Sequence, residues 1–164
     1  MTPDHSPAEL DPQRILEELA AHEVDFVLVG DLAAQTHGSP RMTNDVDVIP
    51  RPEPGNLARL AAALRSLEAH VLNPGQEGAE IEATMLPRAT IWQFATRHGD
   101  VDVLHETPGA APYDQLRERA LVVSVGKVRL PVAGRDDLIR MKLARGRAVD
   151  KADVAALTDP AAEP

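Results

Sequence analysis

Two aspartates separated by one valine are the residues of this chain whose types and spacing most clearly suggest chemistry. Asp45 and Asp47 lie in an alternating Asp-Val-Asp-Val-Ile segment that stops at Pro50. If this segment is a β-strand, the two carboxylates point to the same face and lie side by side. Neighbouring carboxylates repel each other, and a divalent cation such as Mg²⁺, which accepts carboxylate and phosphate oxygens, relieves that repulsion. The alternative is a pair of solvent-facing aspartates on an edge strand.

A short apolar strand, a glycine and a brief helix precede the acidic pair. The apolar run Phe26–Val29 ends in Gly30, as expected of a strand buried on both faces. A helix is expected over Leu32–His37, closed by Gly38. A strand that ends in glycine and leads into a helix presents free backbone N–H groups, which suit phosphate oxygens.

The stretch from Phe26 to Pro50 resembles the signature of the nucleotidyltransferase-fold superfamily, and it is especially similar to the bacterial AbiEii-type nucleotidyltransferase toxin families. In those families a buried strand ends in Gly-Gly or Gly-Ser, a short helix follows, and an Arg-x-Thr/Ser-x-Asp-x-Asp strand completes the site. The matching residues here are Gly30, Asp31, Arg41, Thr43, Asp45 and Asp47. The resemblance implies that the glycine turn receives the β- and γ-phosphates of an NTP, while the acidic strand holds Mg²⁺ (or Mn²⁺) at the α-phosphate.

The resemblance also implies a third carboxylate from a neighbouring strand. Asp100 and Asp102 are the candidates, and Asp102, flanked by two valines, is placed like the third acid of the family. We therefore assign Asp102 as a metal ligand or as the general base that accepts the proton of the acceptor hydroxyl. Asp100 is expected in the turn before the strand.

One position departs from the family pattern. Asp31 stands where the family has a small neutral residue, so its carboxylate would add negative charge near the triphosphate. We expect Asp31 to be the N-cap of the short helix, in the place of serine. Either this carboxylate points away and activity persists, or the domain has lost ordinary triphosphate binding.

Three nearby residues have supporting roles with open alternatives. Arg41 is expected to contact a phosphate or to pair with an active-site carboxylate, unless it is a surface arginine. Thr43 would orient Asp45 or cap the start of its strand. His37 is expected to support the helix C-terminus beside Gly38 rather than to take part in catalysis.

The run from Asp136 to Asp153 also resembles these relatives, which have a helix with Asp-Leu and Lys followed by an Arg-x-x-Asp-x-x-Asp helix start. The resemblance implies that Lys142 reaches toward the nucleotide phosphates, with a plain surface lysine as the alternative. Apolar residues at 138, 139, 141 and 143 cannot share one helical face, so this helix is expected to be well buried. Asp150 is expected to cap the last helix rather than to approach the site.

The remaining pattern predicts a mixed α/β fold, with an antiparallel or mixed sheet flanked by helices, which agrees with the implied nucleotidyltransferase fold. Asp11 and Pro12 mark the start of the first helix. Further helices are expected at about 56–70, 113–119, 135–145 and 149–157, and strands at 45–49, 90–96, 101–104, 121–125 and 128–132. We expect one domain at 10–158 between disordered tails at 1–9 and 159–164.

Composition excludes several classes of function. The chain of 164 residues has no cysteine, which excludes disulfides and thiolate metal sites. Its net charge of −9 argues against broad electrostatic binding to nucleic acid. The longest apolar runs fall far below the roughly 20 residues that cross a bilayer, so no membrane segment and a cytoplasmic location are expected.

The leading hypothesis is a metal-dependent nucleotidyltransferase that moves a nucleoside monophosphate from an NTP to a hydroxyl group. The acceptor stays open among a tRNA, a protein side chain and a small molecule. The toxin resemblance implies a tRNA acceptor and a cognate antitoxin as partner. The alternative is a catalytically weakened or inactive module that binds a nucleotide or a protein partner. A third hypothesis is an acidic interaction domain in which the two aspartates are incidental.

Overall fold

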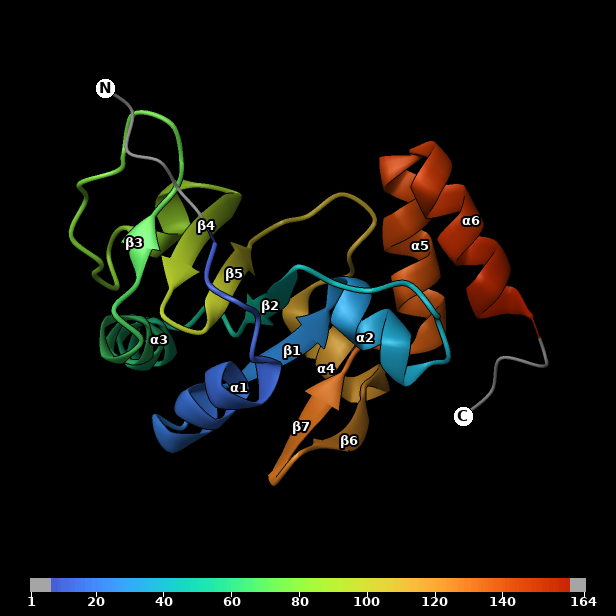
Figure 1. Ribbon diagram of the computed structural model, residues 1–164, viewed down its shortest axis with the longest axis horizontal. Helices are drawn as coiled ribbons and strands as arrows, with labels where there is room; N and C mark the ends of the chain where they lie inside the picture. The colour runs from blue at the N-terminus through green and yellow to red at the C-terminus, as the bar shows by residue number, and fades with distance from the viewer. Residues whose placement is uncertain (1–6, 160–164) are drawn as a thin grey trace.

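The computed structural model describes residues 7–159, so positions 1–6 and 160–164 of the two expected tails lie outside the described residues. The elements in chain order are α1 (Pro12–Ala21), β1 (Phe26–Val29), α2 (Gly30–Thr36), β2 (Asp45–Pro50), α3 (Pro54–Ser66), β3 (His70–Val71), the 3₁₀ turn η1 (Leu86–Arg88), β4 (Ile91–Thr96), β5 (Gly99–Leu104), α4 (Tyr113–Arg119), β6 (Leu121–Val125), β7 (Val128–Val132), α5 (Arg135–Arg145) and α6 (Ala148–Thr158). Figure 1 shows α1 and α3 at one end of the molecule and α5 and α6 packed together at the other.

Within residues 7–159, the strands form one mixed sheet of seven in the order β3-β4-β5-β2-β1-β7-β6. β1 runs antiparallel to β2 and parallel to β7, while β2 runs parallel to β5. This confirms the predicted mixed α/β class. The two acidic segments therefore lie on neighbouring parallel strands, so their side chains are held in fixed register.

Alternation along the central strands separates a buried face from an open one. On β5, Val101 and Val103 are fully buried, and on β4 Trp92 and Phe94 pair with them across the strands. The two rings stack with centroids 6.5 Å apart, and Trp92 Nε1 donates to the Leu86 carbonyl at 2.9 Å. The acidic residues alternate with this buried set, so they occupy the opposite, more open face.

Most predicted elements are confirmed, and the start of α1 follows the predicted capping. The Asp11 carboxylate accepts a hydrogen bond from the Arg14 N–H at 3.2 Å, and Pro12 takes the first helical position. Helix α3, expected to reach residue 70, ends at Ser66 because Leu67 caps it and Glu68 turns left-handed at φ 56°. The two-residue strand β3 and the turn η1 were not predicted.

The start of α2 corrects one prediction. The helix begins at Gly30, and its N-cap is Val29, which makes no side-chain capping bond. Asp31 is therefore inside the first turn and is not the N-cap. The reason is local: Gly30 adopts a φ of 75°, which lets the chain enter the helix two residues earlier than the expected start at Leu32.

The expectation that α5 is well buried is also wrong in part. Leu138 and Met141 face the interior, but Leu143 is 58% exposed. The helix buries Asp137 and Lys142 in addition to its apolar residues. The interior face of α5 is therefore partly charged, which sequence periodicity cannot show.

Within residues 7–159, no helix combines the length and the apolar character needed to span a bilayer.

Candidate functional site

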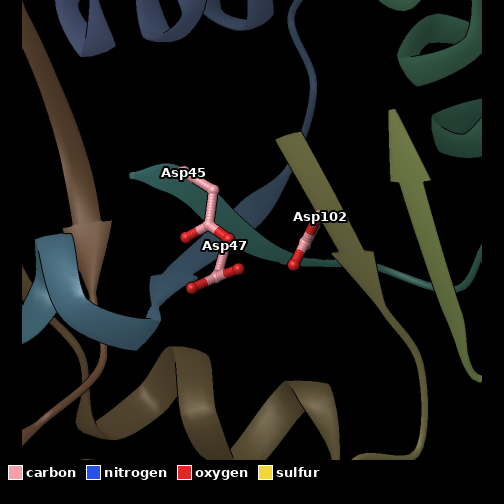
Figure 2. A group of neighbouring side chains, drawn as sticks. All are labelled: Asp45, Asp47 and Asp102. Atoms are coloured by element: carbon pink, nitrogen blue, oxygen red, sulfur yellow. The ribbon is translucent and has the colours of Figure 1, made fainter. Parts of the chain in front are cut away.

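Three carboxylates converge where β2 and β5 run side by side. In the parallel register, Asp47 lies opposite Asp102, and Asp45 lies on the same face of β2. Oxygen atoms of these three side chains all lie within 4.8 Å of one another. Figure 2 shows the carboxylates turned toward the same space beside the two strands. The structure thus brings together the three acids assigned from sequence, here called the aspartate triad.

The environment of the triad disfavours three bare negative charges. Burial is the largest cause that raises the pKa of each of these carboxyls, and repulsion from neighbouring acids adds to it. The pKa of Asp102 is raised to about 7, and that of Asp47 is raised well above its usual value. Close carboxylates with raised pKa values are the donor set that a divalent cation stabilises, since it supplies the missing positive charge. The residues present therefore fit a divalent metal ion.

Asp100 corrects a further prediction, because it belongs to β5 and not to the turn before it. Its Cα pairs with Asp45 in the parallel register. The turn is made by the preceding residues, where the Thr96 hydroxyl donates to the Gly99 carbonyl at 2.6 Å. The charge of Asp100 raises the pKa of both Asp45 and Asp102. It is thus an electrostatic neighbour of the triad.

Gly30 is needed where it lies for a steric reason as well as a conformational one. A Cβ at this position would collide with the Asp47 side chain, whose Cγ would be 2.7 Å away. Asp47 can thus lie against the turn between β1 and α2 only because residue 30 has no side chain. The turn and the triad form one compact site.

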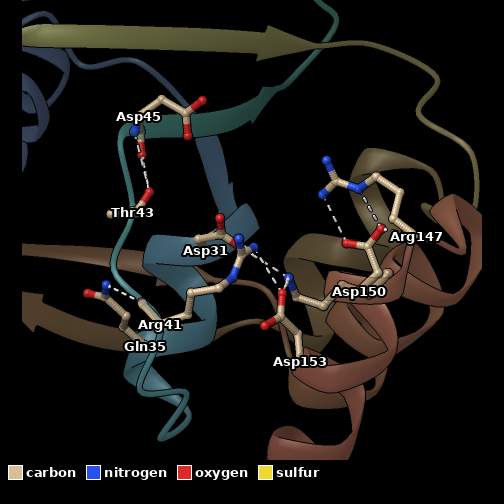
Figure 3. A network of polar contacts seen from close by, with 9 residues as sticks. Asp31, Gln35, Arg41, Thr43, Asp45, Arg147, Asp150 and Asp153 are labelled. Carbon is tan, nitrogen blue, oxygen red and sulfur yellow. Dashed lines mark hydrogen bonds and ion pairs between the residues drawn. The ribbon is translucent and has the colours of Figure 1, made fainter.

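Asp31 pairs with two positively charged side chains, Arg41 and Lys142, which were expected to contact phosphates. Its Oδ1 accepts from Arg41 Nη2 at 2.6 Å and from Lys142 Nζ at 3.1 Å. On the other side, Asp153 Oδ2 lies 2.8 Å from Lys142 Nζ and 2.9 Å from Arg41 Nη2. Figure 3 labels three of these residues, Asp31, Arg41 and Asp153, between α2 and the C-terminal helices. We call Asp31, Arg41, Lys142 and Asp153 the charge cluster.

The charge cluster adjoins the triad. Lys142 is only 4% exposed, which rules out the surface-lysine alternative. It lines a cavity of about 260 Å³ together with Gly30, Asp47 and Asp102. Arg41 forms ion pairs with Asp31 and Asp153, so it is not a free surface arginine. Two positive and two negative charges balance within the cluster, so it offers no net charge to a phosphate unless a carboxylate is displaced.

The remaining assigned residues have structural contacts. The Thr43 hydroxyl donates to the backbone carbonyl of Asp45 at 2.8 Å, which supports its role at the start of the strand rather than contact with the Asp45 carboxylate. His37 caps the C-terminus of α2, and its Nε2 donates to the Ala133 carbonyl at 2.9 Å. Asp150 caps α6 as predicted, and its partner Arg147 lowers the pKa of Asp150 to about 2.

Sequence reasoning missed two parts of the site. Asp153 was seen only as part of a family-like run, and nothing in its spacing indicated that it would hold Lys142 and Arg41. A loop after β5 contributes Thr107 and Pro108 to the cavity beside the triad. No motif marks these loop residues, because their place follows from tertiary packing alone.

No protein-family model matches this chain, and no curated protein matches its sequence. Solved structures do match. The lincosamide antibiotic adenylyltransferase LnuA, solved with lincomycin bound, superposes with a TM-score of 0.61 at 10% identity over 92% of this chain and 98% of its own. A Thermotoga maritima protein assigned as a nucleotidyltransferase gives 0.56 at 15% identity, over 93% and 96%. ANT(2'')-Ia in complex with adenylyl-2''-tobramycin gives 0.51 at 13% identity, over 88% and 93%.

Proposed function

We propose that this chain, which has the nucleotidyltransferase fold, transfers a nucleoside monophosphate from an NTP to a hydroxyl group of a small molecule. The observation that carries the proposal is the aspartate triad, whose oxygens lie within 4.8 Å of one another on neighbouring parallel strands. An incidental pair of surface aspartates would not be accompanied by a third carboxylate in register and by a glycine that makes room for one of them.

Asp45, Asp47 and Asp102 would hold the divalent cation, Mg²⁺ or Mn²⁺. When bound, such an ion supplies positive charge at the α-phosphate and lowers the pKa of an attacking hydroxyl. The chain's own contribution is positioning: the β2–β5 register fixes Asp47 opposite Asp102, and Gly30 lets Asp47 lie against the turn. Most of the catalysis in phosphoryl transfer comes from such positioning and electrostatics.

In the proposed reaction, the acceptor oxygen forms a bond to the α-phosphorus, the bond from that phosphorus to the bridging oxygen breaks, and pyrophosphate leaves. The hydroxyl proton goes to a carboxylate. We propose that Asp102 accepts it, or that Asp102 instead serves only as a metal ligand.

Lys142 and Arg41 are the proposed phosphate contacts, with Gly30 at the turn. Both cations already bind the carboxylates of Asp31 and Asp153, so phosphate oxygens would have to replace at least one of these partners. We infer that triphosphate binding is weakened by this competition, in accord with the departure of Asp31 from the family pattern. Thr43 would act indirectly, through the backbone of Asp45.

A second candidate function is a nucleotide-binding or partner-binding module without turnover. The charge cluster is the specific observation in its favour, because a neutral cluster at the proposed phosphate site weakens the case for an efficient enzyme. Replacement of Asp31 by serine distinguishes the two candidates: a weakened enzyme gains transfer activity, whereas a module without turnover gains only affinity.

For the acceptor we propose a small hydroxylated molecule. Two of the similar structures contain lincomycin and an adenylylated tobramycin, respectively. A tRNA acceptor with a cognate antitoxin rests on the similarity of residues 26–50 to the AbiEii-type families. The net charge of −9 disfavours that polyanionic acceptor.

Label transfer tests the proposed function directly. The protein is incubated with NTPs radiolabelled on the α-phosphate, with Mg²⁺ or Mn²⁺, and with lincomycin, tobramycin or bulk tRNA in separate reactions. We expect label on a small molecule with the wild type and its loss in Asp47→Asn. Asp114→Asn, at an exposed position on α4, is the matched control and should keep the activity. If no acceptor is labelled while Mg²⁺-NTPs still raise the melting temperature, the module without turnover is correct.

A further inference from the structure

A second and larger cavity lies beside the aspartate triad on the same face of the sheet. Its volume is about 630 Å³, within the range of small-molecule sites. Ile49 lines it, two residues after Asp47 on the same face of β2. Thr107 lines both this cavity and the smaller one that contains Asp47 and Asp102. The two cavities therefore adjoin.

The wall of the larger cavity is mostly apolar and includes an aromatic ring. Four prolines, at positions 50, 52, 87 and 112, lie in this wall together with Ile49 and Tyr113. Proline rings are rigid and have little side-chain entropy to lose when a ligand packs on them. Arg88 and Glu106, of opposite charge, are exposed at the same cavity and together favour neither sign of ligand charge.

Two residues of the cavity wall each have a buried polar atom without a partner. Among residues 7–159, neither His105 Nε2 nor Thr107 Oγ1 has a hydrogen bond, although both atoms are shielded from solvent. Buried polar atoms are nearly always bonded, so these two residues of the cavity wall each have an unused hydrogen-bonding group that a side-chain rotation would turn to a ligand. His105 is held in place, because its backbone N–H donates to the Thr90 carbonyl at 2.7 Å.

We propose that this cavity is the acceptor subsite and that it takes a small hydroxylated molecule with an apolar body. Ligand hydroxyls would bond to His105 and Thr107, and the apolar part would pack on the prolines and Tyr113. Burial lowers the pKa of His105, so its imidazole is neutral at neutral pH and can either donate to or accept from a hydroxyl. The assignment rests on the proposed function, since Thr107 places one end of such a ligand beside the triad.

Amide NMR spectra of the whole chain test the assignment with defined probes. Lincomycin and phenyl β-D-glucoside each combine hydroxyls with an apolar body, whereas glucose has hydroxyls alone. We expect both amphipathic probes to shift the resonances of Ala89, Thr107 and Ala111, and glucose to bind at least tenfold more weakly. Shifts confined to another surface, or no shifts with either amphipathic probe, overturn the assignment.

Matched variants localise the binding. Ala110→Trp fills the cavity and should abolish the shifts, whereas Ala79→Trp, on an exposed loop outside both cavities, should leave them intact. Thr107→Val keeps the shape of the side chain and should weaken probe binding by about fivefold. This variant still tests the proposal if Ala110→Trp fails to fold. Wild-type affinity in both Ala110→Trp and Thr107→Val contradicts the proposal.

Paramagnetic broadening by Mn²⁺ in the same samples separates this inference from the proposed function. Broadening at Asp47 and Asp102 without probe shifts at the cavity overturns the acceptor assignment alone. Probe shifts without broadening at these two residues overturn the proposed function, and the acceptor assignment with it.

Discussion

Lys142 on α5 donates to Asp31 on α2 with Nζ 3.1 Å from Oδ1, across 111 residues of sequence. Asp153 on α6 and Arg41 before β2 complete this cluster, so it joins three helices and the loop that leads to the acidic strand. The same lysine lines the cavity that contains Asp47 and Asp102. The buried ammonium group of Lys142 thus links the helices and also faces the proposed nucleotide site. A phosphate bound there would compete with Asp31 and Asp153 for this positive charge.

Replacement of Asp31 by serine should raise the affinity for Mg²⁺-ATP by about tenfold. The change removes a carboxylate that is hydrogen-bonded to Lys142 and Arg41. A hydrogen bond to a charged group is worth about 1.5–3 kcal/mol, which is enough for a tenfold change in affinity. Isothermal titration calorimetry measures the effect, with Asp114→Ser on the exposed side of α4 as control. Equal or weaker binding by Asp31→Ser would mean that the cluster does not compete with phosphates.

Replacement of Lys142 by methionine should lower the free energy of unfolding by about 3–5 kcal/mol, because it leaves Asp31 and Asp153 facing each other with only Arg41 between them. Urea denaturation measures this change. Lys151→Met, at an exposed position on α6, should change stability by less than about 0.5 kcal/mol. A small loss in both variants would show that Lys142 contributes no more than a surface residue.

Two glycine variants separate backbone strain from the contact with Asp47. Gly30 and Gly75 have φ values of 75° and 81°, but a Cβ at residue 75 would meet no atom within 4 Å. Gly75→Ala should therefore cost only the left-handed conformation, about 1–2 kcal/mol. Gly30→Ala should cost at least about 1 kcal/mol more and should weaken Mn²⁺ binding, since Asp47 must move. Equal losses, with Mn²⁺ binding unchanged, would argue against the close fit of turn and triad.

The raised pKa of Asp102 predicts a pH dependence of stability without metal. The folded state keeps this proton up to a pH of about 7, whereas the unfolded chain releases it near the usual value of 3.8. The free energy of unfolding of the wild type should therefore fall between about pH 4 and pH 7, by about 3 kcal/mol relative to Asp102→Asn after allowance for solvent screening. Urea denaturation in the presence of a chelator measures both proteins.

The raised pKa values of Asp45 and Asp47 also make stability fall with rising pH, so the effect of Asp102 is read from the difference between the wild type and Asp102→Asn. The pKa of Asp150 is lowered to about 2. Its stabilising contribution is therefore complete above about pH 4 and is lost only at lower pH. The lowered pKa of His105 acts in the opposite direction, and it cancels in the comparison of the two proteins. Addition of Mg²⁺ should remove the decline in the wild type. A wild type that gains stability relative to Asp102→Asn between pH 4 and 7 would contradict the account.

Sequence alone was sufficient for the parts of the site that depend on strand periodicity. The spacing of Asp45 and Asp47 placed them on one face, and the resemblance selected Asp102, which the register then set opposite Asp47. The site around Gly30 followed from the strand–glycine–helix pattern. These features are local or repeat with a fixed period, so they can be predicted directly from the order of the residues.

Most errors involve contacts between distant segments. The N-cap of α2 shifts to Val29 for a local reason, the left-handed Gly30, but the partners of Asp31 lie on a loop and on α5. Asp100 was expected in a turn, but pairing with β2 and β4 extends β5 back to Gly99. The cavity that contains His105 is lined by loops whose mutual placement has no periodic signature.

Mn²⁺ binding to the aspartate triad, measured by electron paramagnetic resonance of the free ion during titration, tests the central claim most directly. The account predicts one or more sites in the wild type, weakened at least about tenfold by Asp47→Asn and by Asp102→Asn, because each change removes a charged ligand. Asp114→Asn should bind as the wild type does. Equal Mn²⁺ affinity in the wild type and in both triad variants would contradict the account.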